Sequence, residues 1–230
     1  MRLHFFKDFF DLIYPRNCSL CGRSLFDFEV CFCRICIGIL PRTLYHRMPT
    51  ENDLTDKIKG LSNVGMAMSF LRFTSGGKSQ KILHRLKYRN KPEIAEKLGK
   101  LYAQDLIEAN FKNCWDLIVP VPLHPVKLLR RGYNQSEQFA KGLSEGLEVD
   151  YENALERKKF TETQTKKSRL QRMENVEDVF QISAEHSVAN LRILLVDDVI
   201  TTGATLCSCA NVLLANGAKT VDLASIAAGK

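Results

Sequence analysis

The residues best suited to chemistry lie in one segment near the C-terminus, where two acidic residues precede a threonine-rich loop. After the apolar run at residues 191–196, the chain reads Asp197, Asp198, Val199, Ile200, Thr201, Thr202, Gly203, Ala204 and Thr205. A helix is expected to begin at Ala204, and the N–H groups of a loop at a helix N-terminus attract an anion. Gly203 lets the backbone close around a phosphate, and two adjacent carboxylates can accept hydrogen bonds from a vicinal diol. The spacing therefore predicts a ribose 5-phosphate pocket at the carboxyl end of a strand.

Two other interpretations of this segment deserve comparison with the ribose pocket. An apolar strand followed by two aspartates also occurs in ATPases. Their phosphate-binding motif G-x-x-x-x-G-K-[ST] could end here only at residues 77–79, and its first glycine would then stand at position 72, where the chain has Arg72. The sequence therefore excludes an ATPase with this motif. A merely structural turn would not need three threonines and two aspartates together.

A second set of candidate ligands is a cysteine cluster near the N-terminus. Two CxxC pairs, Cys18 with Cys21 and Cys33 with Cys36, lie close together. Each CxxC turn brings two thiolates to one side, and two turns complete the tetrahedral four-sulfur shell that Zn²⁺ prefers. A redox dithiol usually comes singly, and disulfides fit poorly with a chain that we expect to lack an export signal. We therefore expect a structural zinc, with Cys31 as an alternative to Cys33 for the third ligand.

Composition excludes several classes of protein. With 230 residues, 45% hydrophobic and 26% charged, the chain can form one sizeable α/β domain and a small appendage. This composition excludes a disordered protein, and no apolar run approaches the roughly 18–20 residues of a membrane-spanning helix. The apolar N-terminus is interrupted by Lys7, Asp8 and Asp11, which argues against a secretory signal. We therefore expect a cytoplasmic protein without membrane insertion.

Positive charge is concentrated in three segments of the chain. Lys and Arg number 33 against 26 Asp and Glu, which gives a net charge of +7. Residues 78–91 and 127–131 contain basic residues and no acids, and residues 157–172 contain Glu162 as their single acid. One such segment alone is usually a solvated face, but three together favour a phosphate-rich ligand or a nucleic acid.

Strands and helices alternate along the chain, which predicts a parallel sheet with helices on both faces. We expect strands at residues 66–73, 117–119, 191–196 and 221–227, and helices at residues 3–13, 79–89, 134–147 and 204–215, with a further helix from Pro92. Asn134 and Glu137 have the spacing of a capping box. Residues 41–63 indicate a polar linker, and residues 151–178 form a long polar segment typical of a lid or binding loop.

Residues 196–205 resemble the phosphoribosyl pyrophosphate (PRPP) signature of type I phosphoribosyltransferases. More of the chain is similar to one subgroup, the ComF family of competence-associated, GntX-like proteins. The residues that carry this resemblance are Cys18, Cys21, Cys33 and Cys36, the stretches 86–89, 119–124 and 130–135, and Gln164, Arg169, Arg172, Asn175, Val176 and Phe180. The resemblance runs from about Cys18 to the C-terminus.

The resemblance implies an α/β type I phosphoribosyltransferase fold with a central parallel sheet, plus a small N-terminal zinc-ribbon-like module. Residues 1–45 would hold an N-terminal helix and the four-cysteine zinc module, and residues 60–230 would form the phosphoribosyltransferase-type domain. In this family pattern Asp197 and Asp198 would bind the ribose 2′- and 3′-hydroxyls of PRPP. Residues 201–205 would bind its 5-phosphate.

The resemblance also implies which basic and polar residues face the pyrophosphate of PRPP and its Mg²⁺. These residues are Arg130, Arg131, Asn134, Lys87 and Arg169. Arg131 would act with Asp197 and Asp198 as a catalytic residue. Arg169 belongs to the basic segment 157–172, which would close as a lid over the leaving pyrophosphate.

Two functions follow from the resemblance and the charge. The first is a phosphoribosyltransferase that moves ribose 5-phosphate from Mg-PRPP to an acceptor and is linked to competence and DNA uptake. The alternative is a non-catalytic competence protein that binds single-stranded DNA, with PRPP as a regulator or the pocket as a relic, and with a competence translocase or helicase as partner. Aromatic residues that could stack on bases are few near the basic segments, namely Tyr88, Tyr133 and Phe160.

Overall fold

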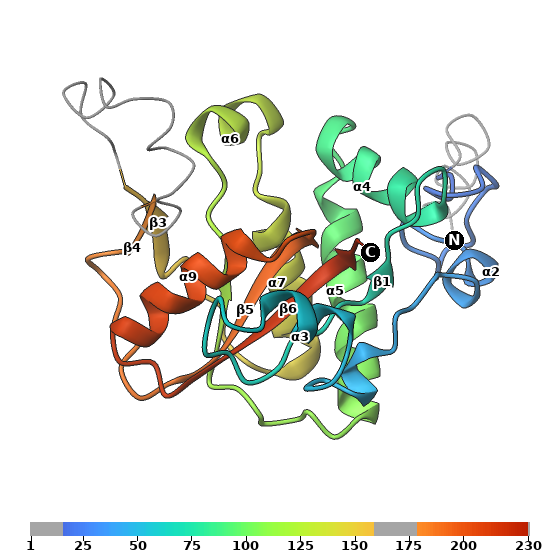
Figure 1. The fold of residues 1–230 in the computed structure, drawn as a ribbon. Coiled ribbons are helices and arrows are strands. Elements are labelled where there is room, and N and C mark those ends of the chain that lie inside the picture. Colours follow the sequence, from blue (N-terminus) through green and yellow to red (C-terminus); the bar gives the residue numbers. More distant parts are fainter. Residues whose placement is uncertain (1–15, 159–178, 230) are drawn as a thin grey trace.

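The computed structural model describes residues 16–158 and 179–229 (Figure 1). The helices are α2 (Arg34–Gly38), α3 (Asp53–Ile58), α4 (Lys78–Tyr88), α5 (Pro92–Glu108), α6 (Pro125–Arg131), α7 (Gln135–Leu147) and α9 (Ala204–Ala215), with a 3-10 helix η1 (Tyr45–Arg47). The strands are β1 (Leu71–Arg72), β2 (Leu117–Pro120), β3 (Leu155–Arg157), β4 (Phe180–Ile182), β5 (Arg192–Ile200) and β6 (Thr220–Ala228). The expected helix at residues 3–13 and residue Arg169 of the expected lid lie outside the described residues.

Four parallel strands form the central sheet in the order β1-β6-β5-β2. The apolar run of β5 is buried on both faces, as parallel strands between two helical layers require. Leu194 and Val196 face one hydrophobic core, and Ile193 and Leu195 face the other. The parallel α/β architecture expected from the sequence is confirmed.

Helices cover both faces of this sheet. In Figure 1, α9 and α3 lie on the near side of the strands and α7 lies on the far side. The helices α5 and α7 pack closely because glycines stand at their contact: a Cβ at Gly142 would lie 2.0 Å from the carbonyl oxygen of Glu96. Short β3 and β4 form a separate antiparallel pair beside α9.

The segment 41–63 differs from the expected polar linker. It contains η1 and α3, and α3 buries Leu54 and Ile58 in the same core as α9. A capping box between Asn52 and Thr55 closes the N-terminus of α3. The segment is therefore a packed part of the fold, and the cysteine module joins the main core directly through Phe32 and Leu40.

Three local expectations are also corrected by the structure. Regular β1 contains two residues, although the preceding chain hydrogen-bonds to β6 through the N–H groups of Met68 and Phe70. Strand β5 continues beyond residue 196 to Ile200, because its backbone still pairs with β6. Glu137 accepts a hydrogen bond from Asn153 (3.2 Å) instead of completing a capping box. Among the described residues, no helix is long and apolar enough to cross a bilayer.

Candidate functional site

The two adjacent aspartates lie together at the carboxyl end of β5. The strand continues through them, since Asp197 pairs with Ser225 of β6. The Ser136 hydroxyl, at the start of α7, donates to Asp197 Oδ1 at 2.8 Å, and the N–H of Asp198 donates to the same atom at 2.7 Å. Lys87 Nζ, from α4, lies 2.9 Å from Asp198 Oδ2. Elements far apart in sequence therefore fix both carboxylates at one edge of the sheet.

The environment of Asp197 changes its acidity. Burial and the neighbouring charge of Asp198 raise the pKa of Asp197 to about 7, although the hydrogen bond from Ser136 and the charge of Lys87 oppose the rise. Near neutral pH this carboxyl is therefore present in both protonation states. Perturbed carboxyls of this kind are typical of functional sites.

The loop at residues 201–205 turns from the end of β5 into α9. Gly203 is the N-cap of α9 and has a φ of 80°, a left-handed conformation that favours glycine. The hydroxyl of Thr202 accepts a hydrogen bond from the N–H of Ala204 at 3.4 Å. Thr201 and Thr202 are exposed, and the loop borders a shallow depression of about 30 Å³ that also includes Asp197. Backbone N–H groups at a helix N-terminus are suited to bind a phosphate.

Asn134 connects the end of β2 to α7. Its side-chain amide donates to the carbonyl oxygen of Val121 (3.0 Å), and its oxygen accepts from the N–H of Ser136. Asn134 is buried. Through these contacts Asn134 has a structural role, because it positions Ser136 beside Asp197.

The arginines near the end of β2 have different surroundings. Arg131 Nη1 donates to Gln135 at 2.6 Å, and its buried Nε has no hydrogen-bond partner among the described residues. Arg130 is exposed on α6. Arg157, at the end of β3, donates from Nε to the carbonyl of Pro122 (3.2 Å), and burial lowers its pKa. Positive charge thus surrounds the segment that follows β2.

Two residues of this site were not singled out by the sequence. Ser136 lies in the first turn of α7, and Lys57 of α3 donates to the carbonyl oxygen of Thr201 at 3.3 Å. No local pattern marks either residue, because their partners are 61 and 144 positions away. The N-cap position of Asn134 was the one signal that pointed toward Ser136.

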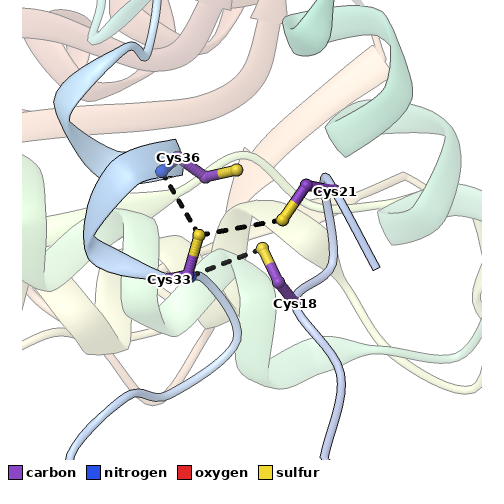
Figure 2. A group of neighbouring side chains, drawn as sticks. All are labelled: Cys18, Cys21, Cys33 and Cys36. Atoms are coloured by element: carbon purple, nitrogen blue, oxygen red, sulfur yellow. Dashed lines mark hydrogen bonds between the residues drawn. The ribbon is translucent and has the colours of Figure 1, made fainter. Parts of the chain in front are cut away.

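The four expected zinc ligands form a compact cluster (Figure 2). The Sγ atoms of Cys18, Cys21, Cys33 and Cys36 all lie within 4.8 Å of one another. Cys21 Sγ and Cys33 Sγ are 3.8 Å apart, close to the separation of about 3.8 Å that a tetrahedron with Zn–S bonds of about 2.3 Å requires. The N–H groups of Cys33 and Cys36 point at cluster sulfurs at 3.4 Å. Cys33, and not Cys31, is the third member of the cluster.

Comparison with known proteins supports the same type of fold. The chain matches the phosphoribosyl transferase domain over residues 86–230. It is similar to the DNA utilization protein YhgH of Salmonella typhi, with 35% identity over 62% of this chain and 63% of that protein. It is also similar to competence protein F of Haemophilus influenzae (30% identity, 64% of this chain and 66% of that protein). A third relative is competence protein ComFC of Streptococcus pneumoniae (34% identity, 56% of each).

The chain spans less than two thirds of the length of these relatives. Solved structures with a similar fold include the glutamine PRPP amidotransferase of Bacillus subtilis (24% identity, TM-score 0.40, 56% of this chain and 25% of that chain). Another is the adenine phosphoribosyltransferase of Leishmania tarentolae (15% identity, TM-score 0.39, 69% of this chain and 76% of that chain). Because both TM-scores are below 0.5, the assignment rests on the sequence match. The chain belongs to the phosphoribosyl transferase domain family, and within it to the ComF-type proteins.

Proposed function

We propose that this protein binds Mg-PRPP at the carboxyl end of β5 and transfers its ribose 5-phosphate to an acceptor. The observation that carries the proposal is the placement of Asp197 and Asp198 directly beside the loop 201–205. The carboxylates, which can accept hydrogen bonds from a diol, and the phosphate-binding loop are thereby only a few residues apart at the end of one strand. This placement suits a ribose 5-phosphate, which carries a diol at one end and a phosphate at the other.

Residues of this chain would divide the work of binding and transfer. The carboxylates of Asp197 and Asp198 accept hydrogen bonds from the ribose hydroxyls, and the loop N–H groups bind the 5-phosphate. During transfer the bond from C1 to pyrophosphate breaks, pyrophosphate takes the electron pair, and the acceptor forms a new bond to C1. Fixed cations such as Arg131 and Arg157 stabilise the charge that develops on the leaving pyrophosphate.

The carboxylates also suit Mg²⁺, which prefers oxygen ligands. Within the described residues, Asp197 Oδ2 and Asp198 Oδ1 accept no hydrogen bond, so two hard oxygen donors are available. Most ligands of the ion would come from water and the pyrophosphate. Bound Mg²⁺ would neutralise part of the negative charge of the pyrophosphate.

Calorimetric titration tests this function. Mg-PRPP is titrated into the wild type, Asp198→Asn and Asp150→Asn; the last removes an exposed carboxylate outside the site. We expect Asp198→Asn to weaken binding about tenfold or more, because the variant loses about one charge-assisted hydrogen bond to the ribose. Asp150→Asn should bind as the wild type does. Equal affinity of Asp198→Asn and the wild type would refute the pocket, and pyrophosphate release with candidate acceptors then tests turnover.

We propose a structural Zn²⁺ in the four-cysteine cluster of Cys18, Cys21, Cys33 and Cys36. Four thiol groups in a tetrahedral arrangement are the donor set that Zn²⁺ prefers, and among the described residues this group of potential metal ligands contains only cysteines. A module of this size has a small core, so the metal would contribute directly to its folding.

A second candidate function is binding of single-stranded DNA, which a specific surface favours. A groove of about 780 Å³ between the cysteine module and α4 is lined by Leu20, Gly76, Gln80, Lys81, His84, Arg85, Arg89 and Lys91. No acidic residue lines this groove, and the exposed rings of Phe26 and Phe28 stack at 5.6 Å on the same module. Cations for phosphates and exposed aromatic rings for bases are the features of such sites.

The salt dependence of binding separates this second function from the first. DNA held through several phosphates should lose affinity steeply as salt rises, with a slope of about −0.7 per neutralised phosphate. Charge removal by Arg85→Gln and Arg89→Gln should lower that slope, while Mg-PRPP affinity stays unchanged. Failure of a labelled oligonucleotide to bind the wild type at low salt would refute the DNA function.

A further inference from the structure

Helix α3 contacts the loop 201–205, although α3 lies before the residues that match the family. The family match begins at residue 86, whereas α3 spans Asp53–Ile58. Its N-terminus is closed by the capping box of Asn52 and Thr55, and its buried face packs in the core beside α9. The helix is therefore held rigidly in the fold, and residues of its last turn can fix the position of a neighbouring loop.

Lys57 connects this support to the ends of two neighbouring strands. Its Nζ donates to the carbonyl oxygen of Gly229 at 2.7 Å and to that of Thr201 at 3.3 Å. The regular pairing of β5 with β6 ends one residue earlier, at Ile200 and Ala228. The ammonium group thus extends the connection between the strands to the first residue of the loop.

Ile58 holds the other end of the same loop. A Cβ at Gly203 would lie 2.6 Å from Ile58 Cγ2, so the glycine backbone packs directly against this side chain. Ile58 is buried. Two consecutive residues of α3 therefore fix the first and third residues of the loop 201–205.

The contact with Thr201 also sets the direction of a potential phosphate donor. In a trans peptide the C=O and the following N–H point in opposite directions. Because the carbonyl of Thr201 points to Lys57, the N–H of Thr202 points away from α3. Without a cation to bind, that peptide unit could rotate, and the N–H would no longer be fixed.

We infer that Lys57 is a positioning residue that holds the loop 201–205 in its phosphate-binding conformation, an inference that rests on the proposed function. The ammonium group acts through the backbone and also places a positive charge beside the loop. Its removal should selectively weaken ligands that carry a 5-phosphate. Inorganic pyrophosphate, which lacks one, should be unaffected.

The test compares Lys57→Met, Lys57→Arg and the control Lys59→Met. Lys59 is exposed and lies two residues further along, so its removal lowers the net charge equally without touching the loop. Calorimetry with ribose 5-phosphate, Mg-PRPP and inorganic pyrophosphate gives three affinities for each protein. We expect Lys57→Met to bind the first two about tenfold more weakly, as lost preorganisation implies, and pyrophosphate within about twofold. Lys57→Arg should recover part of the loss.

Amide hydrogen exchange provides a readout that needs no ligand. The amides of Cys207 and Gly229 are protected at the borders of the loop, because they donate to the carbonyl oxygens of Gly203 and Ile200. We expect these two amides to exchange faster in Lys57→Met than in the wild type or Lys59→Met, while the amides within β5 remain protected. Unchanged exchange at these positions would overturn the inference, as would an equal loss for all three ligands. If the wild type binds neither PRPP nor ribose 5-phosphate, the proposed function fails, and the exchange experiment still decides whether Lys57 positions the loop.

Discussion

Replacing Asp197 by Asn should make the protein more stable and less able to bind its ligand. The substitution removes a carboxyl whose pKa is raised to about 7 by burial and by the charge of Asp198. An Asn oxygen can still accept the hydrogen bonds that Ser136 and the N–H of Asp198 now donate. The variant therefore keeps the packing of the site and loses the cost of its charge.

The sign of the effect follows from the two pKa values. The folded protein keeps the proton of Asp197 up to about pH 7, whereas the ordinary value is 3.8. The stability contributed by the protonated form is thus present below about pH 4 and lost as the pH rises through about 7. At about 1.4 kcal/mol per pH unit, the free energy of unfolding that is lost between these two pKa values has an upper limit of about 4 kcal/mol. Since Asp197 is half-buried and partly screened by solvent, we expect about 1–2 kcal/mol.

Urea unfolding at pH 4.5 and pH 8 measures this difference. Asp197→Asn should exceed the wild type in free energy of unfolding at pH 8 and approach it at pH 4.5. Asp116→Asn is the control of opposite sign, because hydrogen bonds from Arg192 lower the pKa of Asp116 to about 2. That variant should be less stable than the wild type at pH 8. If Asp197→Asn is no more stable than the wild type at pH 8, or if its gain is equal at both pH values, the folded protein does not hold the proton of Asp197 up to neutral pH.

Two further substitutions test the cysteine cluster and the loop. Cys33→Ser should lose zinc in metal analysis by mass spectrometry, while Cys31→Ser should keep it, because Cys31 lies outside the cluster; equal zinc content in both would contradict the ligand set. Gly203→Ala places a Cβ 2.6 Å from Ile58 at a φ of +80°, which should cost about 2–4 kcal/mol in urea unfolding. Gly38→Ala, which has open space around its Cβ, should cost less than half of that.

Local patterns predicted the parts of the site that are contiguous in sequence. The strand, loop and helix around residues 191–215 and the two CxxC pairs depend on neighbouring residues, and the structure forms both. The same patterns could not decide between Cys31 and Cys33. In the structure Cys31 packs against the main hydrophobic core and lies outside the cluster, a tertiary contact that has no local sequence signal.

Contacts between distant segments explain what the sequence did not predict. Strand β5 extends through Asp197 because β6 pairs with it, and pairing between parallel strands has no local signal. The polar composition of residues 41–63 concealed α3, although Leu54 and Ile58 have the four-residue spacing of a helix face. The sequence did not indicate a role for Lys57, because its hydrogen-bond partners are backbone carbonyls far along the chain.

Amide NMR spectra of the ¹⁵N-labelled protein during titration with Mg-PRPP would locate the binding site residue by residue. We expect the largest chemical-shift changes at the amides of residues 198–206 and at Ser136, where the carboxylates and the phosphate loop meet. The groove residues 80–91, apart from Lys87, should shift little. If the amides of residues 198–206 do not shift in the folded, zinc-loaded protein, or if the shifts are confined to the groove, Mg-PRPP does not bind at the carboxyl end of β5.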